Sequence, residues 1–345
     1  MVVVRNDYNT ILRDNLPVLD VRAPTEFNRG SIPNSTNLPI LNDSERSKVG
    51  IEYKQQGNEA AVKLGFNLVN EREKEIRVSS WSRFLHSNPD ALLTCWRGGQ
   101  RSEIAQRWLA NIGIDVPRIA GGFKAIRQYS LEIFAQSNTR KWIVVAGSTG
   151  VGKTQFLNNY RESIDLEAIA HHRGSAFGQL DTPQPTPVSF ELALTQCLLQ
   201  TDQFNSCLIE DESRTIGRLA IPSQLYAAMQ TSPIVVLESS LEARIQLTYE
   251  RYVRNEDSFK LLNALKRIQK RLGRERYAVV KAQLDRAIEG HSESLHLDWI
   301  ARLFDWYYDP MYEYQLNRKL DRVVFRGNTS EVRDFLRHEY QIFPT

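Results

Sequence analysis

The sequence predicts two α/β domains with parallel sheets, followed by a helical C-terminal region. Its 345 residues exceed the size at which one hydrophobic core usually stops growing. Short apolar strands alternate with long helical stretches in both halves, and this alternation is typical of parallel sheets. The polar string AQSNTR at 135–140 interrupts the pattern and is the candidate linker. We therefore expect domains at 1–134 and 141–254, and a helical region at 255–345.

Each predicted strand is a short apolar run bounded by polar or turn-forming residues. In chain order these runs are LPVLDV at 16–21, ALLTC at 91–95, KWIVVAG at 141–147, SCLIEDE at 206–212 and SPIVVLE at 232–238. TPQPTP at 182–187 contains too many prolines for a helix or a central strand, so we expect a surface loop there. From about Asn255 the apolar spacing predicts helices to the end of the chain.

The composition is that of an ordinary globular protein, with 41% hydrophobic and 25% charged residues. The start, MVVVRNDYNTIL, lacks the pattern of a signal peptide, and no apolar run is long enough to span a membrane. We therefore expect a cytoplasmic protein with no membrane partner. Cys95, Cys197 and Cys207 fit neither a disulfide framework nor a zinc site, so any cysteine chemistry rests on one reduced thiol.

The most specific short motif is GSTGVGKT, which directly follows the strand KWIVVA. It matches the phosphate-loop pattern G-x-x-x-x-G-K-[ST] through Gly147, Ser148, Thr149, Gly150, Val151, Gly152, Lys153 and Thr154. In such a loop the backbone N–H groups surround a phosphate, the lysine adds a mobile charge and the hydroxyl holds Mg²⁺. The motif predicts a site for a di- or triphosphate, and it does not specify the attached group, ATP and GTP included.

Acidic residues end the strand at 206–212, where they are placed to hold magnesium together with Thr154. Asp211 or Glu210 is the preferred ligand, and a solvated acidic turn is the alternative. HHRGSAFG at 171–178 is compatible with a second anion-binding loop through Arg173, or with a turn around a buried phenylalanine.

The stretch TCWRGGQRS at 94–102 places a cysteine at the end of a buried strand. Loop N–H groups, the positive end of a helix expected to start near Ser102, and two arginines all favour a thiolate. We expect Cys95 to be a nucleophile, and a buried cysteine that acts as a small hydrophobic residue is the alternative. The loop comprises Cys95, Trp96, Arg97, Gly98, Gly99, Gln100, Arg101 and Ser102.

Segments on both sides of this loop resemble a rhodanese domain. DVRAPTEFNRGSIPNSTNLPI at 20–40 is similar to the front half of that domain, and IAGGFKAIRQY at 119–129 to its closing segment. The resemblance implies a rhodanese-like parallel-sheet domain whose cysteine carries sulfur as a persulfide. However, Cys95 to Arg101 is C-x5-R, one residue longer than in common single-domain members. That length is seen in dual-specificity phosphatases and fits a tetrahedral anion, so persulfide carrier and phosphatase both remain open.

A rhodanese-like domain, a P-loop NTPase-like α/β domain and a helical C-terminal extension form an unusual combination. With YKQQG at 53–57, HRGSAFG at 172–178, EDESR at 210–214, YYDPMYEYQL at 307–316 and VVFRG at 323–327, this order resembles bacterial tRNA 2-selenouridine synthases. The resemblance implies a transferase that acts on the wobble 2-thiouridine of lysine, glutamate and glutamine tRNAs. It implies geranylation of the sulfur with geranyl diphosphate, followed by its replacement with selenium from selenophosphate, which a selenophosphate supply enzyme provides.

The same resemblance implies roles for the candidate residues. Lys153, its loop and magnesium would hold the diphosphate, and Cys95 with Arg97 and Arg101 would receive selenophosphate. Cys95 would then form a perselenide or only position the donor. The basic stretch at 260–281 becomes the candidate for tRNA contact through Lys266, Arg267, Lys270, Arg271, Arg274 and Arg276, with a solvated helix face as the alternative. Tyrosines at 307–314 would stack a base or simply pack.

Three other functions fit parts of the sequence. They are a C-x5-R phosphatase regulated by a nucleotide, a P-loop kinase or NTPase with the N-terminal domain as a binding module, and a non-catalytic sulfur-relay adaptor. Loss of Lys153 would abolish nucleotide turnover in the second and would leave the third unaffected.

Overall fold

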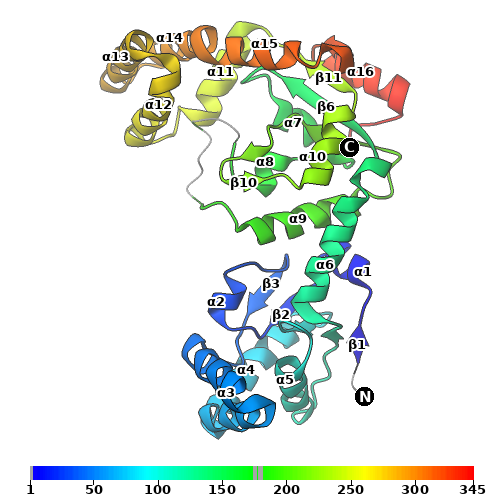
Figure 1. The fold of residues 1–345 in the computed structure, drawn as a ribbon. Coiled ribbons are helices and arrows are strands. Elements are labelled where there is room, and N and C mark those ends of the chain that lie inside the picture. The colour runs from blue at the N-terminus through cyan, green and yellow to red at the C-terminus, as the bar shows by residue number, and fades with distance from the viewer. Residues whose placement is uncertain (1–2, 174–176, 178–181) are drawn as a thin grey trace. The chain divides into compact units, whose positions relative to one another are not determined.

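The computed structural model describes residues 3–173, 177 and 182–345, and it divides into two compact units (Figure 1). Unit 1 comprises Met1–Ala135 and Pro185–Gln200, and unit 2 comprises Gln136–Gln184 and Thr201–Thr345. The boundary lies at the polar string that sequence analysis marked as a linker, where a short 3₁₀ helix, η1 (Ser137–Thr139), forms. The segment 185–200 lies within the range expected for the phosphate-loop domain, yet it belongs to unit 1.

Unit 1 is built on a five-stranded sheet of order β1-β5-β4-β2-β3, whose neighbouring strands are all parallel. Its strands are β1 (Val4–Arg5), β2 (Val18–Asp20), β3 (Ser35–Asn37), β4 (Leu92–Thr94) and β5 (Arg118–Ile119). All residues of β2 and β4 are buried, which explains why both strands are mainly apolar in the sequence. The parallel sheet expected for this half is confirmed.

Seven helices accompany this sheet among the described residues of unit 1. They are α1 (Tyr8–Arg13), α2 (Pro24–Phe27), α3 (Asp43–Leu68), α4 (Glu71–Ser87), α5 (Gln100–Ala110), α6 (Gly122–Ala135) and α9 (Pro187–Gln200). α9 packs its leucines into the same apolar cluster as α1 and α6, and Thr195 shares a 2.6 Å hydrogen bond with Ser130 of α6. These contacts explain why a segment that follows the phosphate loop in sequence belongs to unit 1.

Unit 2 contains a second five-stranded parallel sheet, of order β12-β11-β6-β8-β7. Its strands are β6 (Lys141–Gly147), β7 (Ser163–Ile164), β8 (Ser206–Glu210), β11 (Ile234–Leu237) and β12 (Val323–Gly327), and β9 (Thr215–Ile216) pairs with β10 (Leu219–Ala220) in an antiparallel ribbon. β12 corrects the expectation of helix from Asn255 to the end of the chain. The sequence VVFRG instead pairs with β11 and forms one edge of this sheet.

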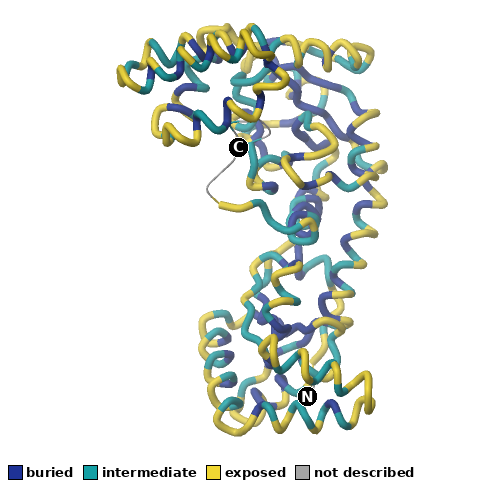
Figure 2. The backbone as a smooth tube through the Cα atoms, turned by 60° about the vertical axis from the view of Figure 1, so that its left-hand side comes forward, coloured by how far each residue is buried: buried dark blue, intermediate teal, exposed yellow. Residues whose placement is uncertain are grey.

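Some helices of unit 2 pack on its sheet, and others form a second apolar core of their own. The helices are α7 (Lys153–Leu157), α8 (Leu166–Ile169), α10 (Ser223–Thr231), α11 (Leu241–Tyr252), α12 (Ser258–Leu272), α13 (Arg274–Gly290), α14 (Glu293–Leu303), α15 (Asp309–Asn317) and α16 (Thr329–Tyr340), with the short π-helix η2 (Phe304–Tyr308) and 3₁₀ helix η3 (Leu320–Arg322). Buried side chains of α11 to α14 and η2 meet in that core. Figure 2 shows these buried stretches alternating with exposed ones along the helices. None of the helices in the described ranges is both long and apolar enough to cross a membrane.

A fully buried ion pair lies at the carboxyl end of β2. Arg22 Nη2 is 2.7 Å from Asp20 Oδ2, and both side chains are inaccessible to solvent. The guanidinium also donates to Gly30 O at 2.9 Å and lies 3.8 Å from the centre of the Phe123 ring. Burial raises the pKa of Asp20, against the opposing effect of Arg22. The pair therefore joins β2, the turn after α2 and the start of α6.

We predict that Asp20→Asn lowers the free energy of unfolding by about 3 kcal/mol or more, because it leaves a buried guanidinium without its counter-charge. Asp14→Asn is the matched control, since Asp14 pairs with Arg13 on the surface. It should change stability by less than about 1 kcal/mol. Urea denaturation followed by circular dichroism measures both, and equal effects would contradict the assignment.

Candidate functional site

Strand β4 delivers Cys95 to a tight loop that ends in helix α5. The helix begins at Gln100 with Gly99 as its N-cap, slightly earlier than the sequence indicated. Cys95 is 3% exposed, and its Sγ lies 3.2 Å from Ser102 Oγ and 3.9 Å from Gly99 O. The thiol therefore contacts the first turn of α5, where the unpaired N–H groups of the helix favour negative charge.

The segment that resembles the end of a rhodanese domain supports this loop. Phe123 N donates to Cys95 O at 2.9 Å, and Lys124 N donates to Trp96 O at 3.0 Å. The rings of Trp96 and Phe123 stack with their centres 5.5 Å apart. Gly122 has a φ of 61°, and a Cβ atom there would overlap the carbonyl oxygen of Cys95. Only glycine allows the two backbones to approach so closely.

The two arginines of the loop have different surroundings. Arg97 is exposed, whereas Arg101 forms an ion pair with Glu26 that includes a 3.2 Å hydrogen bond from Nη2 to Oε1. Arg46 of α3 reaches the same carboxylate at 3.2 Å. Burial tends to raise the pKa of Glu26, but Arg101, the backbone N–H of Ala23 and Arg46 together hold the pKa below its ordinary value. Sequence reasoning missed Glu26, which compensates the charge expected to face the anion.

A cavity of about 1,070 Å³ lies beside the thiol, entirely within unit 1. Six of the eight predicted loop residues line it: Cys95, Trp96, Arg97, Gly99, Gln100 and Arg101. Gly98 packs against the backbone of the support segment, and Ser102 is buried behind the thiol. The remaining wall comes mainly from α3 and α5. The thiol loop thus has room for a ligand considerably larger than a tetrahedral anion.

In unit 2, GSTGVGKT forms the turn between β6 and α7. Gly150 has a φ of 81°, and a Cβ atom there would lie 2.8 Å from Arg244 O, so only glycine fits between the loop and α11. Lys153 Nζ donates to Gly147 O at 2.9 Å. A cavity of about 530 Å³ is lined by the loop through Gly147, Thr149, Gly150, Val151, Gly152, Lys153 and Thr154, while Ser148 lies outside the lining.

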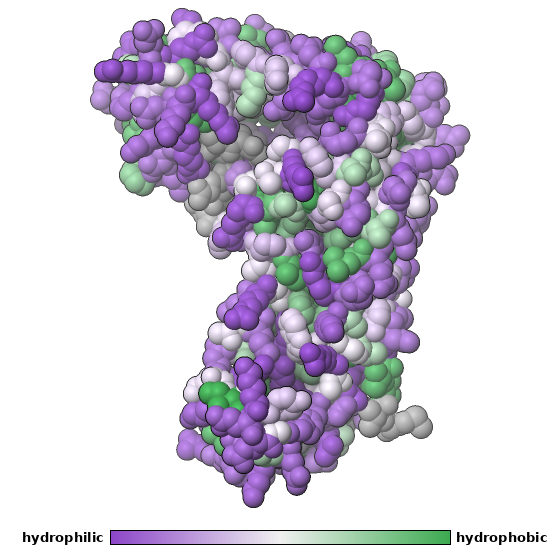
Figure 3. Space-filling model, in the orientation of Figure 1, coloured by the Kyte–Doolittle hydropathy of each residue, from purple (hydrophilic) through white to green (hydrophobic). Residues whose placement is uncertain are grey.

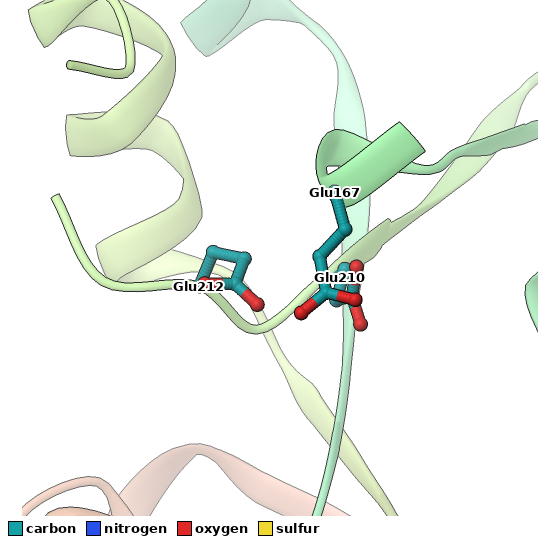
Figure 4. A group of neighbouring side chains, drawn as sticks. All are labelled: Glu167, Glu210 and Glu212. Carbon is teal, nitrogen blue, oxygen red and sulfur yellow. The ribbon is translucent and has the colours of Figure 1, made fainter. Parts of the chain in front are cut away.

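Three glutamates converge in this cavity (Figure 4). Glu210 ends β8, Glu212 follows it, and Glu167 comes from α8; each offers a carboxylate oxygen within 4.8 Å of the others. Glu210 is 1% exposed, and its Oε2 has no hydrogen-bond partner among the described residues. Asp211 instead pairs with Lys319, with Nζ 2.6 Å from Oδ1. Of the two preferred ligands, the geometry therefore favours Glu210 over Asp211.

The charge of this cluster is not balanced by the protein alone. Burial raises the pKa of Glu167 to about 8 and that of Glu212 to about 7, and it raises the pKa of Glu210 well above its ordinary value. Repulsion from neighbouring carboxylates adds to the pKa shifts of Glu167 and Glu210, and Asp211 adds to that of Glu212, while Lys153 opposes all three. A hard divalent cation prefers carboxylate and hydroxyl oxygens. The glutamates and Thr154, which line the same cavity, are therefore a donor set that fits Mg²⁺.

Basic side chains line the same cavity, through Arg173, Arg251, Arg267 and Arg271. Arg173 Nη1 donates to Arg251 O at 3.2 Å, and its guanidinium lies 4.9 Å from the centre of the Tyr252 ring. The predicted anion-binding arginine is thus placed at the phosphate cavity. Of the other residues of HHRGSAFG, Phe177 stacks on Trp299 at 5.8 Å, and 174–176 and 178 lie outside the described residues.

The six basic residues predicted to contact tRNA are all exposed and lie on α12 and α13, where the surface is strongly hydrophilic (Figure 3). They separate into three groups. Arg267 and Arg271 line the phosphate cavity, and Arg271 Nη1 donates to Tyr307 Oη at 3.4 Å. Arg276 lies over the Trp306 ring. Lys266, Lys270 and Arg274 form the third group, which lies outside the cavity lining.

An ion pair between Arg244 and Asp309 supports the phosphate loop, and sequence reasoning missed it. Arg244 of α11 donates from Nε to Thr149 O at 2.9 Å and from Nη1 to Asp309 Oδ2 at 3.1 Å. Asp309 belongs to YYDPMYEYQL, so part of that motif is explained by support of the loop. Tyr307 and Tyr308 are buried in the helical core and pack edge to face. These two rings therefore take the packing role rather than the stacking one.

We predict a pH dependence of stability for the metal-free chain. Between pH 4.5 and about 8 the folded chain retains protons on Glu167 and Glu212 that the unfolded chain has released, so the free energy of unfolding falls as pH rises. Glu212→Gln should flatten this slope, and Glu59→Gln, on an exposed side chain, should leave it unchanged. Urea denaturation in EDTA at several pH values tests this, and a slope equal in all three chains would contradict it.

Comparison with known proteins places these two sites in a family. Residues 5–129 match a model of the rhodanese-like domain, and residues 140–342 match a model described as the tRNA 2-selenouridine synthase AAA domain. The tRNA 2-selenouridine synthase of Sulfurovum sp. is 43% identical, with 97% of this chain and 98% of the relative covered. That of Hydrogenovibrio crunogenus is 42% identical, with 97% and 99% covered. The chain therefore belongs to the tRNA 2-selenouridine synthase family of tRNA-modifying enzymes.

Proposed function

We propose that this chain makes 2-selenouridine in tRNA in two steps, geranylation of the wobble 2-thiouridine and then exchange of the geranylated sulfur for selenium. The observation that carries the proposal is the presence of two different anion sites in one chain. One is a phosphate loop beside a cluster of carboxylates, and the other is a cysteine loop beside a large cavity. The names of the relatives support 2-selenouridine as the product.

The phosphate cavity suits the first step. The sulfur of 2-thiouridine attacks the allylic carbon of geranyl diphosphate, the carbon–oxygen bond breaks, and diphosphate leaves. Lys153, the loop N–H groups and the arginines at 267 and 271 would stabilise the charge of the leaving diphosphate. Mg²⁺ held by Thr154 and Glu210, with Glu167 and Glu212 close by, would neutralise part of the same charge.

The thiol loop suits the second step. S-geranylated uridine, selenophosphate and water give 2-selenouridine, geranylthiol and phosphate, and no electrons are gained or lost. A perselenide on Cys95 would require an oxidant, because a thiolate and selenide must lose two electrons to form a sulfur–selenium bond. We therefore propose that Cys95 positions the selenium donor, with Arg97 near the anion and the first turn of α5 stabilising its charge.

The substrate class follows from the names of the relatives and from the charge of α12 and α13. Lysine, glutamate and glutamine tRNAs are the proposed acceptors, and a selenophosphate supply enzyme is the proposed partner, both acting in the cytoplasm. Lys266, Lys270 and Arg274 would contact the tRNA backbone. Arg267 and Arg271 would serve the diphosphate instead, because they line its cavity.

We predict that the two sites can be inactivated separately. Lys153→Ala should slow geranylation roughly 100-fold or more, because the leaving diphosphate loses a charge. Cys95→Ser should slow selenium entry roughly 100-fold and leave geranylation largely intact, because the donor is misplaced. Mass spectrometry of nucleosides, with thiolated tRNA for the first step and pre-geranylated tRNA for the second, measures both rates.

Circular dichroism of both variants controls for folding. Loss of both steps in a folded Cys95→Ser protein would contradict the division of labour. Formation of neither geranylated nor selenated uridine by the unmodified chain, with tRNA binding verified, would overturn the proposed function.

We also predict that replacing Lys266, Lys270 and Arg274 together with alanine weakens tRNA binding and reduces its salt dependence. Each lost phosphate contact should lower the slope of log K against log salt by roughly 0.7 to 0.9. Arg286→Ala on α13, which lies outside the predicted set, is the matched control. Filter binding at several salt concentrations measures the slope, and an unchanged slope in the triple variant would contradict a tRNA-binding role.

A further inference from the structure

Large apolar side chains are exposed around the cavity next to Cys95. Ile51, Tyr53 and Phe66 of α3 are 52%, 58% and 47% exposed, and Trp96 of the thiol loop is 38% exposed. All four line this single cavity. A hydrophobic patch is visible over α3 in Figure 3. Apolar surface gathered in this way is unfavourable in water and marks a binding site for apolar groups.

The shape of α3 brings these side chains to one wall. The helix is interrupted at Gly57, which has a φ of 85° and a ψ of −171°. Ile51 and Tyr53 precede the interruption and Phe66 follows it, so two separate helical arms line the same cavity. Gly57 ends the YKQQG motif, to which the two anion sites assign no role. The motif is thereby explained as the bend that shapes this wall.

The charged groups of the same cavity are almost all basic. Arg29, Arg46, Lys54, Arg97 and Arg101 line it, against one acid, Glu26, which is already paired with Arg101. An apolar wall with a basic rim complements a ligand that has a hydrocarbon chain at one end and anionic groups at the other. A free hydrocarbon would not use the rim, and an unmodified RNA would not use the wall.

We infer that this cavity binds the hydrocarbon chain of an S-alkylated nucleoside while the phosphates of the surrounding RNA contact the basic rim. The inference rests on the proposed function and deepens it, because it assigns the prenyl-type chain to unit 1. The chain places the alkylated sulfur beside Cys95, where selenium is delivered. The same cavity holds the geranylthiol that leaves, and it distinguishes alkylated tRNA from the thiolated tRNA that has not yet reacted.

Binding tests this without catalysis. The probes are two fluorescent anticodon stem–loop RNAs that differ only in S-geranyl-2-thiouridine or 2-thiouridine, titrated with the full chain in the absence of selenophosphate. The unmodified chain should bind the geranylated RNA roughly tenfold more tightly or better. The double variant Ile51→Ser, Phe66→Ser should reduce that preference to within about threefold. Both residues are about half exposed, so these substitutions should not disturb folding.

Ile76→Ser is the matched control. Ile76 has the same 52% exposure as Ile51 but lies on α4, outside the cavity lining. This variant should keep the preference of the unmodified chain. No preference in the unmodified chain, or a full preference in the double variant, would overturn the assignment. Sedimentation provides a further test. If the unmodified chain is a dimer and the double variant is a monomer, the assignment is overturned, because the apolar wall would then bind a second copy.

Nucleoside analysis of the same proteins separates this inference from the proposed function. Selenouridine formed by an unmodified chain with no binding preference means that the function holds and the cavity assignment fails. A preference lost only in the double variant, with no selenouridine formed from geranylated RNA, supports the cavity assignment and rejects the proposed second step.

Discussion

Both units depend on a close approach of two backbone segments at the carboxyl edge of a parallel sheet. In unit 1, Gly122 lies against the carbonyl of Cys95, and in unit 2, Gly150 lies against that of Arg244. A side chain at either glycine would push the loop away from its support. Because the loops are held by backbone contact, their N–H groups are presented with little freedom, which is what recognition of an anion requires.

Several charged groups around these loops form ion pairs within the protein. Asp20 pairs with Arg22, Glu26 with Arg101, Asp211 with Lys319, and Arg244 with Asp309. The cluster of Glu167, Glu210 and Glu212 differs, because its three carboxylates lie within 4.8 Å of one another and Lys153 is the cation that lowers the pKa of each. The charged groups that support the loops are therefore paired within the protein, whereas the glutamate cluster beside the phosphate loop can bind a cation. This difference separates the residues that support the site from those that can act in it.

The two units also differ in the kind of cavity that accompanies each loop. The cavity of the phosphate loop is lined by arginines and glutamates, which suits a polyphosphate with a metal ion. The cavity of the thiol loop has an apolar wall and a basic rim. A reaction that uses both a diphosphate and a hydrocarbon chain on RNA needs both kinds of surface. The chemistry proposed for each unit therefore follows from its own lining and does not depend on how the units are arranged.

The sequence by itself determined the α/β class with parallel strands, the phosphate loop and the thiol loop, because each leaves a pattern in neighbouring residues. Strands such as KWIVVAG are apolar after their first residue because both faces are covered, and glycines at fixed spacing mark loops that bind anions. Only the tertiary structure decided which distant residues meet these loops. Glu167 lies beside Glu210 although more than forty positions separate them, Arg101 pairs with Glu26, and Asp211, directly after β8, pairs with Lys319. Likewise, α9 joins unit 1 by packing with α1 and α6, and β12 joins the sheet of unit 2 by pairing with β11. No local sequence pattern encodes either contact. Long-range contacts of this kind depend on the path of the whole backbone, which spacing along the chain does not specify.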